Sequence, residues 1–330
     1  MRRGLLFLFA LALHAQDRAA WMRDAKFGVM THYLADWIAR GTHEPMSIDR
    51  WNSLVGGFDV ERIAEQLKSA GAGYYVISIG QNSGYYLAPN TVYDKLTGIS
   101  PSKLARRDLV ADLYEAMHKR GIRLMVYLPS GAPSGDKAAV ASLHWRNGPD
   151  RNKEFQQKWE QVIREWSLRW GKKVSGWWFD GCYWPNTMYR TEDGPNFATF
   201  AAAARAGNPD AALAFNPGVI HRLISITPYE DYIAGEIDDP EKIAIKRAAD
   251  GKQDGAQLHV LTHLGAQWGM GAPRFTPAQA AEWSRKVVRE GGAITWDTPV
   301  DATGLIAPEF AEQLKAIGNA VHDDVPRTRR

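Results

Sequence analysis

The stretch Val174-Ser175-Gly176-Trp177-Trp178-Phe179-Asp180-Gly181 decides how the rest of the chain is interpreted. It starts as an apolar, aromatic run typical of a short buried strand and ends in a carboxylate followed by glycine. Aspartate is disfavoured inside strands, so we expect Asp180 at the carboxyl end of its strand. In a parallel α/β barrel that end faces the active site, and Gly181 permits a sharp turn or close ligand approach. Asp180 is therefore a candidate functional carboxylate, the alternative being a cap for the next helix.

Apolar segments bounded by turn residues alternate with amphipathic segments along most of the chain. We predict strands at 27–33, 74–80, 123–129, 176–180, 213–216, 232–237, 258–264 and 293–297. We predict helices at 60–70, 103–120, 153–170, 197–206, 241–249, 277–290 and 308–321, with Asp59 and Thr276 as N-caps. Eight strands alternating with helices predict an α/β fold, a (β/α)8 TIM-like barrel in a single domain. A doubly wound sheet is the alternative, but no glycine-rich phosphate motif follows the first strand.

Composition bears on nucleic-acid binding, on sugar binding and on the role of cysteine. The 330 residues are 45% hydrophobic and 23% charged, and the net charge of +3 comes with no basic run that would indicate nucleic-acid binding. Thirteen Trp residues are a weak indication of sugar binding, because indole faces pack well on sugar rings. Cys182 is the only cysteine, so no internal disulfide is expected. It is either a nucleophile or, as we favour, a buried packing residue.

The N-terminus has the pattern of a secretory signal peptide. Met1-Arg2-Arg3 precedes an apolar run over residues 4–13 and then His14-Ala15. The run is too short to span a bilayer, so no membrane anchor is expected. We predict a signal peptide over 1–15, a catalytic domain over 16–330 and a secreted or periplasmic protein.

Polar residues at the ends of the predicted strands should converge on the mouth of the barrel. They are His32, Gln81, Asn82, Tyr127, Asp180, Asn216, Glu236, His263 and Asp297. No histidine or cysteine spacing indicates a metal site, and we predict neither a metal nor a cofactor. Glycoside hydrolysis needs two carboxyl groups, one to protonate the leaving oxygen and one to attack carbon or activate water. Asp180 is the candidate nucleophile. Glu236, among apolar residues, suits a general acid of raised pKa or is an ordinary ion-paired residue.

These motifs, in this order, resemble the α-L-fucosidase family of glycoside hydrolases from Trp21 to about Val321. The matching stretches are Trp21-Met22-Arg23-Asp24-Ala25-Lys26-Phe27-Gly28 with His32, Thr42-His43-Glu44-Pro45-Met46, residues 70–76, Arg107-Asp108-Leu109-Val110, Lys119-Arg120-Gly121, Trp178-Phe179-Asp180-Gly181, Trp268-Gly269-Met270-Gly271 and Gly291-Gly292.

The resemblance implies Asp180 as catalytic nucleophile and Glu236 as acid/base, with Glu44 a rival for the second role. It implies sugar contacts for His32, Glu44, Tyr127 and Trp178. We add Gln81, Asn82, Asn216, His263 and Trp268 to the predicted substrate-binding residues.

One departure leaves the sugar open. Gln81-Asn82 stand where the family has two histidines that hydrogen-bond sugar hydroxyls. We therefore consider three functions, all with an oligosaccharide or glycoconjugate as partner. They are a retaining exo-glycosidase acting on α-L-fucosides or a related sugar, a glycosidase of the same fold with another sugar, and a sugar-binding barrel without turnover.

Overall fold

The structure, a computed structural model, describes residues 17–183, 192–243, 245 and 251–323. The predicted signal peptide over 1–15 lies outside the described residues. So does most of the helix predicted over 241–249, where the described part contains a 3-10 turn, Pro240–Lys242.

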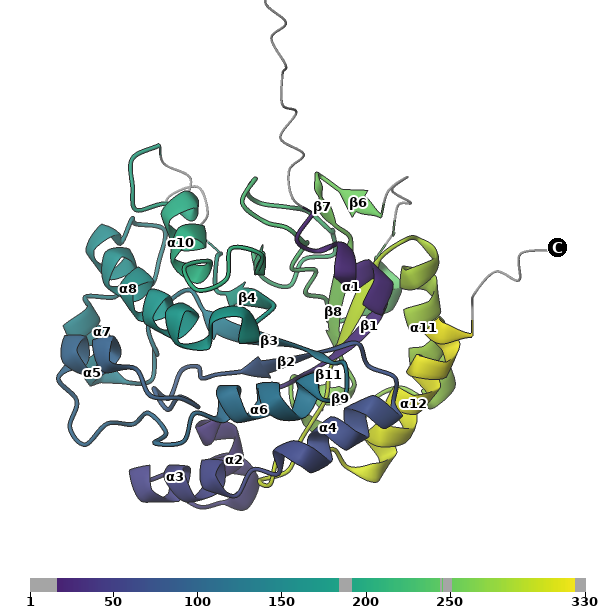
Figure 1. The fold of residues 1–330 in the computed structure, drawn as a ribbon, viewed down its shortest axis with the longest axis horizontal. Helices are drawn as coiled ribbons and strands as arrows, with labels where there is room; N and C mark the ends of the chain where they lie inside the picture. The colour runs from purple at the N-terminus through teal and green to yellow at the C-terminus, as the bar shows by residue number, and fades with distance from the viewer. Residues whose placement is uncertain (1–16, 184–191, 244, 246–250, 324–330) are drawn as a thin grey trace, which may run out of the picture.

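A curled sheet of seven parallel strands forms the centre of the molecule (Figure 1). Its spatial order is β5-β4-β3-β2-β1-β11-β8. The strands are β1 (Phe27–Thr31), β2 (Tyr74–Ser78), β3 (Arg123–Pro129), β4 (Gly176–Asp180), β5 (Ala212–Phe215), β8 (His259–His263) and β11 (Ala293–Asp297). Seven of the eight predicted strands are thereby confirmed, and their carboxyl ends lie at one edge of the sheet because every pairing in it is parallel.

Helices surround the sheet, most of them on its outer face (Figure 1). They are α1 (Ala20–Ala25), α2 (Ala35–Thr42), α3 (Ile48–Gly56), α4 (Val60–Ser69), α5 (Thr91–Thr97), α6 (Leu109–His118), α7 (Lys137–Leu143), α8 (Lys153–Trp170), α10 (Phe197–Ala204), α11 (Pro277–Arg289) and α12 (Pro308–His322). Asp59 and Thr276 cap α4 and α11 as predicted. The helix predicted over 103–120 is shorter, because the Asp108 side chain accepts the Ala111 N–H and fixes the start of α6.

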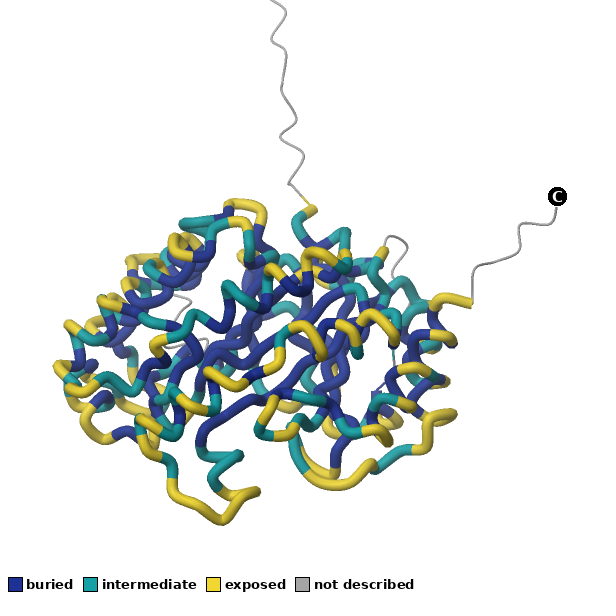
Figure 2. Tube along the Cα trace, turned by 60° about the horizontal axis from the view of Figure 1, so that its bottom comes forward, coloured by how far each residue is buried: buried dark blue, intermediate teal, exposed yellow. Residues whose placement is uncertain are grey.

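Successive side chains of a strand point to opposite faces, so the sheet separates two apolar layers. On β4, Trp177 and Phe179 pack outward against the helices, whereas Trp178 belongs to an inner cluster with Tyr127 of β3. Nearly all residues of the seven strands are buried, while the outer helical surfaces carry the exposed residues (Figure 2). The inner cluster fills the interior of the curled sheet and leaves the carboxyl ends of the strands open.

The predicted strand 232–237 is wrong as a continuous strand. Residues 230–237, which we call the seam segment, lie between β5 and β8 and form only two isolated parallel bridges, Tyr232 to Gln257 and Glu236 to Leu261. On the side of the seam segment that faces β5, side chains form hydrogen bonds to the main chain of β5. The Asp231 carboxylate accepts the Leu213 N–H at 2.9 Å, and the Glu230 carboxylate accepts the Phe215 N–H at 2.8 Å. Carboxylates thus replace the carbonyls that a regular strand would offer β5.

Two short antiparallel ribbons lie outside the main sheet. One pairs β9 (Gly265–Gln267) with β10 (Met270–Pro273), and the other pairs β6 (Lys252–Gln253) with β7 (Ala256–Gln257). The turn between β9 and β10 carries Trp268. It therefore brings a large aromatic side chain to the open edge of the sheet.

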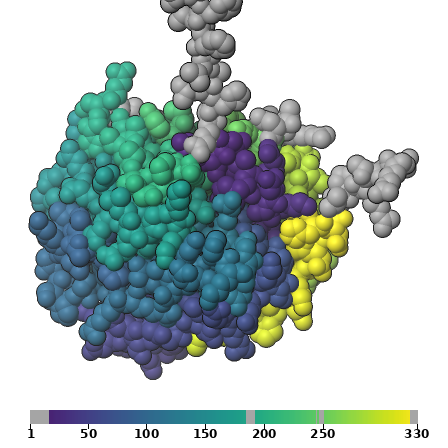
Figure 3. All heavy atoms as spheres, viewed as in Figure 1, coloured from purple at the N-terminus to yellow at the C-terminus, as the bar shows by residue number. Residues whose placement is uncertain are grey.

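The beginning and the end of the described chain meet on the surface. Helix α1, purple in Figure 3, lies beside the yellow α12, and the Lys26 ammonium donates to the Val321 carbonyl at 2.8 Å. None of the helices in the described ranges combines the length and apolar character needed to cross a membrane.

Candidate active site

Asp180 lies at the carboxyl end of β4, as its place in the sequence predicted. Its Oδ2 accepts from the Tyr127 hydroxyl at 2.7 Å, and its Oδ1 accepts from the Asn216 amide at 2.9 Å and from the Gly181 N–H at 2.7 Å. Gly181 has φ +78°, so the chain turns away directly after the carboxylate. The next described helix, α10, is capped by Asn196, so the cap alternative finds no support. The side chain is held rigidly by neighbouring strands.

Asn216 joins the two predicted catalytic carboxylates. Its Nδ2 donates to Asp180 Oδ1 at 2.9 Å and to Glu236 Oε2 at 2.6 Å. Because both oxygens accept from the same nitrogen, the distance between Asp180 Oδ1 and Glu236 Oε2 cannot exceed the sum of these two distances, about 5.5 Å. The carboxyl groups of the seam segment and of β4 therefore face each other across a single amide group.

The surroundings of Glu236 favour its protonated form. Burial, and then the negative charge of Asp180, raise the pKa of Glu236 to about 8, while the Asn216 hydrogen bond opposes this rise. Two adjacent carboxylates in a dry site cannot both ionise at little cost. At neutral pH Glu236 therefore carries a proton that it can donate.

A small aromatic cavity of about 180 Å³ lies over this pair. Its lining residues come from four strands (β1, β3, β4 and β8), from helix α2, from the seam segment and from the loops between elements: Met30, His32, Trp37, Gln81, Tyr127, Trp178, Asp180, Glu236, Leu261 and Trp268. Tyr127 and Trp178 are ladder partners whose rings stack at 5.3 Å, and the Trp178 indole donates to the Ala234 carbonyl at 3.1 Å. The same indole therefore lines the cavity and ties β4 to the seam segment.

His32 is oriented by a buried acid. Its Nδ1 lies 2.8 Å from Asp297 Oδ1, and Asp297 is fully buried. Since a carboxylate only accepts, the Nδ1 proton points to Asp297, and Nε2 has no partner among the described residues. The ring packs against Trp37, with centroids 4.9 Å apart. His32 thus presents a fixed imidazole to the cavity.

Gln81 and Asn82, which stand where the family has two histidines, form hydrogen bonds with different partners. The Gln81 amide donates to the Tyr127 hydroxyl at 2.6 Å, which in turn donates to Asp180. Burial raises the Tyr127 pKa well above its usual value, so this hydroxyl keeps its proton. The Asn82 side-chain oxygen instead accepts from the Ser134 hydroxyl at 2.8 Å, outside the small cavity. Only Gln81 belongs to the chain of hydrogen bonds that ends on Asp180.

Other predicted residues are not brought to the carboxylates. Glu44 is exposed and ion-paired with Arg50 at 3.1 Å, and it does not line the small cavity. His263 does not line the cavity either. Its Nδ1 bonds the Gly265 carbonyl, and its ring packs at 4.6 Å on Trp268, which it supports from behind.

Asp238, an acid close to Glu236 in the sequence, and Cys182 do not take part in this hydrogen-bonded site. Asp238 is exposed and pairs with His221 at 3.0 Å, which lowers the pKa of that carboxyl. Cys182 is fully buried, and burial raises its thiol pKa, as expected of a packing residue.

Trp37, Met30 and Leu261 also line the cavity but were not among the predicted site residues. Trp37 lies on α2, for which no helix was predicted, and Met30 and Leu261 look like ordinary strand residues. The signal that could have found them is strand periodicity, because both point to the inner face with Trp178. Among the described residues, no group of three or more His, Cys, Asp or Glu side chains is arranged to hold a metal ion.

The fold and the sequence family are those of a glycoside hydrolase. The chain belongs to the α-L-fucosidase family, whose sequence model matches residues 43–323. No curated protein matches it.

Solved structures with this fold share little sequence with the chain. An endo-fucoidan hydrolase of glycoside hydrolase family 107 has 16% identity and a TM-score of 0.69, over 92% of this chain and 93% of that one. The α-L-fucosidase AlfC of Lactobacillus casei, in complex with α-L-fucose, has 18% identity and a TM-score of 0.63, over 93% and 98%. An α-L-fucosidase of family 29 from Bacteroides thetaiotaomicron has 17% identity and a TM-score of 0.61, over 92% and 73%. These likenesses support the curled parallel sheet as the common scaffold.

Proposed function

We propose that this protein hydrolyses α-L-fucosides with retention of configuration, using Asp180 as nucleophile and Glu236 as acid/base. The observation that carries the proposal is the Asn216 amide between the two carboxylates. Retaining enzymes hold these groups about 5–5.5 Å apart, whereas inverting enzymes need about 6.5–9.5 Å to admit water. The Asp180 Oδ1 and Glu236 Oε2 atoms are at most about 5.5 Å apart, and this closeness supports retention.

The proposed reaction has two steps. Asp180 attacks the anomeric carbon while Glu236 gives its proton to the leaving oxygen, so the glycosidic bond breaks and a glycosyl ester forms. Glu236, now a carboxylate, takes a proton from water, and the water oxygen attacks the same carbon to release Asp180. The raised pKa of Glu236 suits the first step, and a general base suits the second.

The small cavity supports a deoxy sugar as the ring that is cleaved off. Met30 and Leu261 give it an apolar part, which fits the methyl group of a 6-deoxy sugar such as fucose. His32 offers an imidazole nitrogen to a hydroxyl, and Trp268 and Trp178 offer aromatic faces to the C–H side of the ring.

The test is hydrolysis of nitrophenyl α-L-fucoside beside galactoside, arabinoside and rhamnoside substrates, with the anomer first released identified by NMR. We expect fucoside cleavage with retention, and loss on the order of 10³-fold or more in kcat for Asp180→Asn with an unchanged fold. First release of the inverted anomer, or near-full turnover by the variant, would contradict the mechanism. Failure on every glycoside would favour a sugar-binding protein.

A further inference from the structure

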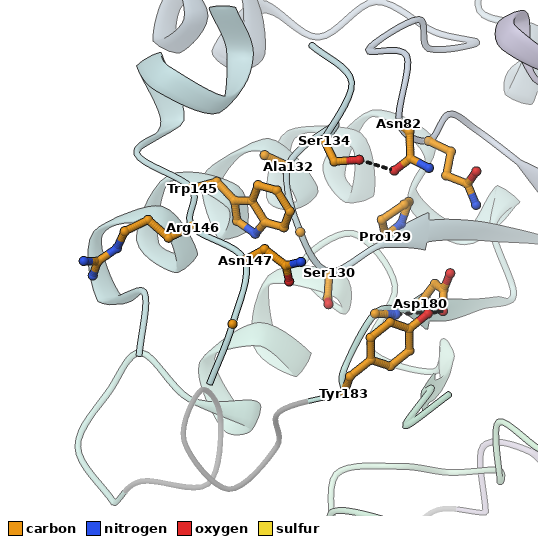
Figure 4. Close-up of a pocket in the computed structure, with 14 residues that line it drawn as sticks. Asn82, Pro129, Ser130, Ala132, Ser134, Trp145, Arg146, Asn147, Asp180 and Tyr183 are labelled. Atoms are coloured by element: carbon orange, nitrogen blue, oxygen red, sulfur yellow. Dashed lines mark hydrogen bonds between the residues drawn. The ribbon is translucent and has the colours of Figure 1, made fainter. Parts of the chain in front are cut away.

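Asp180 also faces a second, larger cavity of about 350 Å³ (Figure 4). This cavity, which we call the outer cavity, lies beyond the carboxyl ends of β2, β3 and β4. It shares only Asp180 and Gln81 with the small cavity. Its volume is within the range of small-molecule sites, about 300–1,000 Å³. A glycosidic bond cleaved at Asp180 has one sugar on each side, so two cavities meeting there can hold the two halves of a substrate.

Trp145 forms an aromatic wall of the outer cavity (Figure 4). Its indole lies against the chain at Gly131, where a Cβ atom would lie 3.0 Å from the indole nitrogen. Phe155 packs against the indole in an edge-to-face arrangement, with ring centroids 6.4 Å apart. The indole nitrogen forms no hydrogen bond with any described residue. The wall therefore offers an apolar face and one unused donor.

Two amides complete the wall with unused polar atoms. The Asn82 side-chain oxygen accepts from Ser134, and its main-chain carbonyl accepts from Gly135 at 2.8 Å, so its position is fixed and its NH₂ group is left over. The Asn147 side chain forms no hydrogen bond with any described residue. Amide donors and acceptors beside an aromatic face match the hydroxyl groups and C–H face of a sugar.

Charge decides which kind of sugar fits. Among the lining residues, only Asp180 and Arg146 are charged at neutral pH. The Arg146 guanidinium points away from Asp180, and its Nε donates to Asn152 at 3.3 Å (Figure 4). A carboxylated or sulfated sugar would meet the Asp180 charge, whereas the one cationic lining residue, Arg146, is directed away from that carboxylate.

We propose that the outer cavity binds the leaving group and that this group is an uncharged sugar, stacked on Trp145 and hydrogen-bonded by Asn82 and Asn147. The inference rests on the proposed function, because it takes Asp180 as the point of cleavage. It assigns leaving-group specificity to residues 145–148, which no motif of the family resemblance includes.

The test compares α-L-fucosyl fluoride, which leaves the outer cavity empty, with disaccharides of α-L-fucose on a neutral hexose or on a uronic acid. Trp145→Ala should lower kcat/KM for the neutral disaccharide about 10- to 100-fold and change kcat/KM for the fluoride by less than about threefold. Trp145→Phe should retain part of the activity, and Asn147→Ala should act in the same direction, more weakly. Trp283→Ala, a partly buried Trp on the remote helix α11, is the matched control and should change neither substrate selectively.

Equal losses on both substrates, or no loss on either, would overturn the inference while the proposed function stands. Preference for the uronic acid disaccharide would overturn the uncharged class. A wild-type protein that cleaves neither the fluoride nor a disaccharide would overturn the proposed function and, with it, this inference.

Discussion

Replacing Glu236 by Gln should stabilise the protein by an amount that grows with pH. The pKa of Glu236 is about 8 in the folded protein, against an ordinary value of 4.5. The folded state therefore binds more protons than the unfolded state between these values. The relative stability that this proton gives is fully present below about pH 4.5 and is lost as pH rises through about 8. Gln has no proton to lose, so the variant should escape the loss.

The size of the effect follows from the shift. Each pKa unit corresponds to about 1.4 kcal/mol. The free energy of unfolding of the variant relative to wild type should thus rise by about 3 kcal/mol between pH 4.5 and 7, and by about 5 kcal/mol at pH 8 and above. A new amide contact in the variant adds a constant that does not depend on pH. The slope, not the absolute difference, is the quantity to measure.

Urea denaturation of both proteins at pH 5, 6, 7 and 8 measures this slope. Glu309→Gln, which removes an exposed carboxylate at the start of α12, is the control and should change by less than about 1 kcal/mol over the range. An equal difference between Glu236→Gln and wild type at pH 5 and pH 8 would refute the reasoning that burial beside Asp180 holds the proton on Glu236.

Four further outcomes are expected. Wild-type kcat/KM should fall above about pH 8 as Glu236 loses its proton, and a limb below pH 6 in place of this one would contradict that assignment. Asn216→Ala should lower kcat/KM about 10- to 100-fold, since it removes a donor from two carboxylates; unchanged kinetics would remove the amide from the mechanism. Gly235→Ala should lower the melting temperature far more than Gly98→Ala, because both have φ +65° but only a Cβ at Gly235 meets a carbonyl, at 2.1 Å; equal shifts would count against this steric reason. Mass spectrometry of exported protein should find an N-terminus near Gln16, and retention of Met1 would contradict the predicted signal peptide.

The sequence predicted the sheet well because a buried parallel strand is a local pattern. The apolar run before Asp180 and the glycine after it determine where β4 ends, and no distant contact is needed to see this. The segment 232–237 carries the same apolar pattern and does not become a strand. What decides its structure is the acidic pair Glu230 and Asp231, whose side chains reach the amides of β5. Such side-chain to main-chain bonds depend on the tertiary arrangement.

The site was predictable to the same degree. Asp180, Glu236, Tyr127 and Trp178 follow from strand ends and motif order, and all four line the small cavity. Glu44 was suggested by motif position alone, yet the chain around it places the side chain in solvent. Trp37 could not be predicted, because a helical residue enters this cavity only through the packing of α2 against the mouth.

The carboxylates of the seam segment also protect the protein from aggregation by strand addition at the edge of its sheet. A sheet that ends in free amides offers a template on which a strand of another molecule can add, and this is a common route to aggregation. Here the amides of Leu213 and Phe215 are already bound to Asp231 and Glu230, and Arg205 holds Asp231 in an ion pair. An incoming strand would have to displace charged acceptors instead of meeting empty donors. The side-chain hydrogen bonds that take the place of a regular strand at 232–237 thus also block strand addition at the edge of β5.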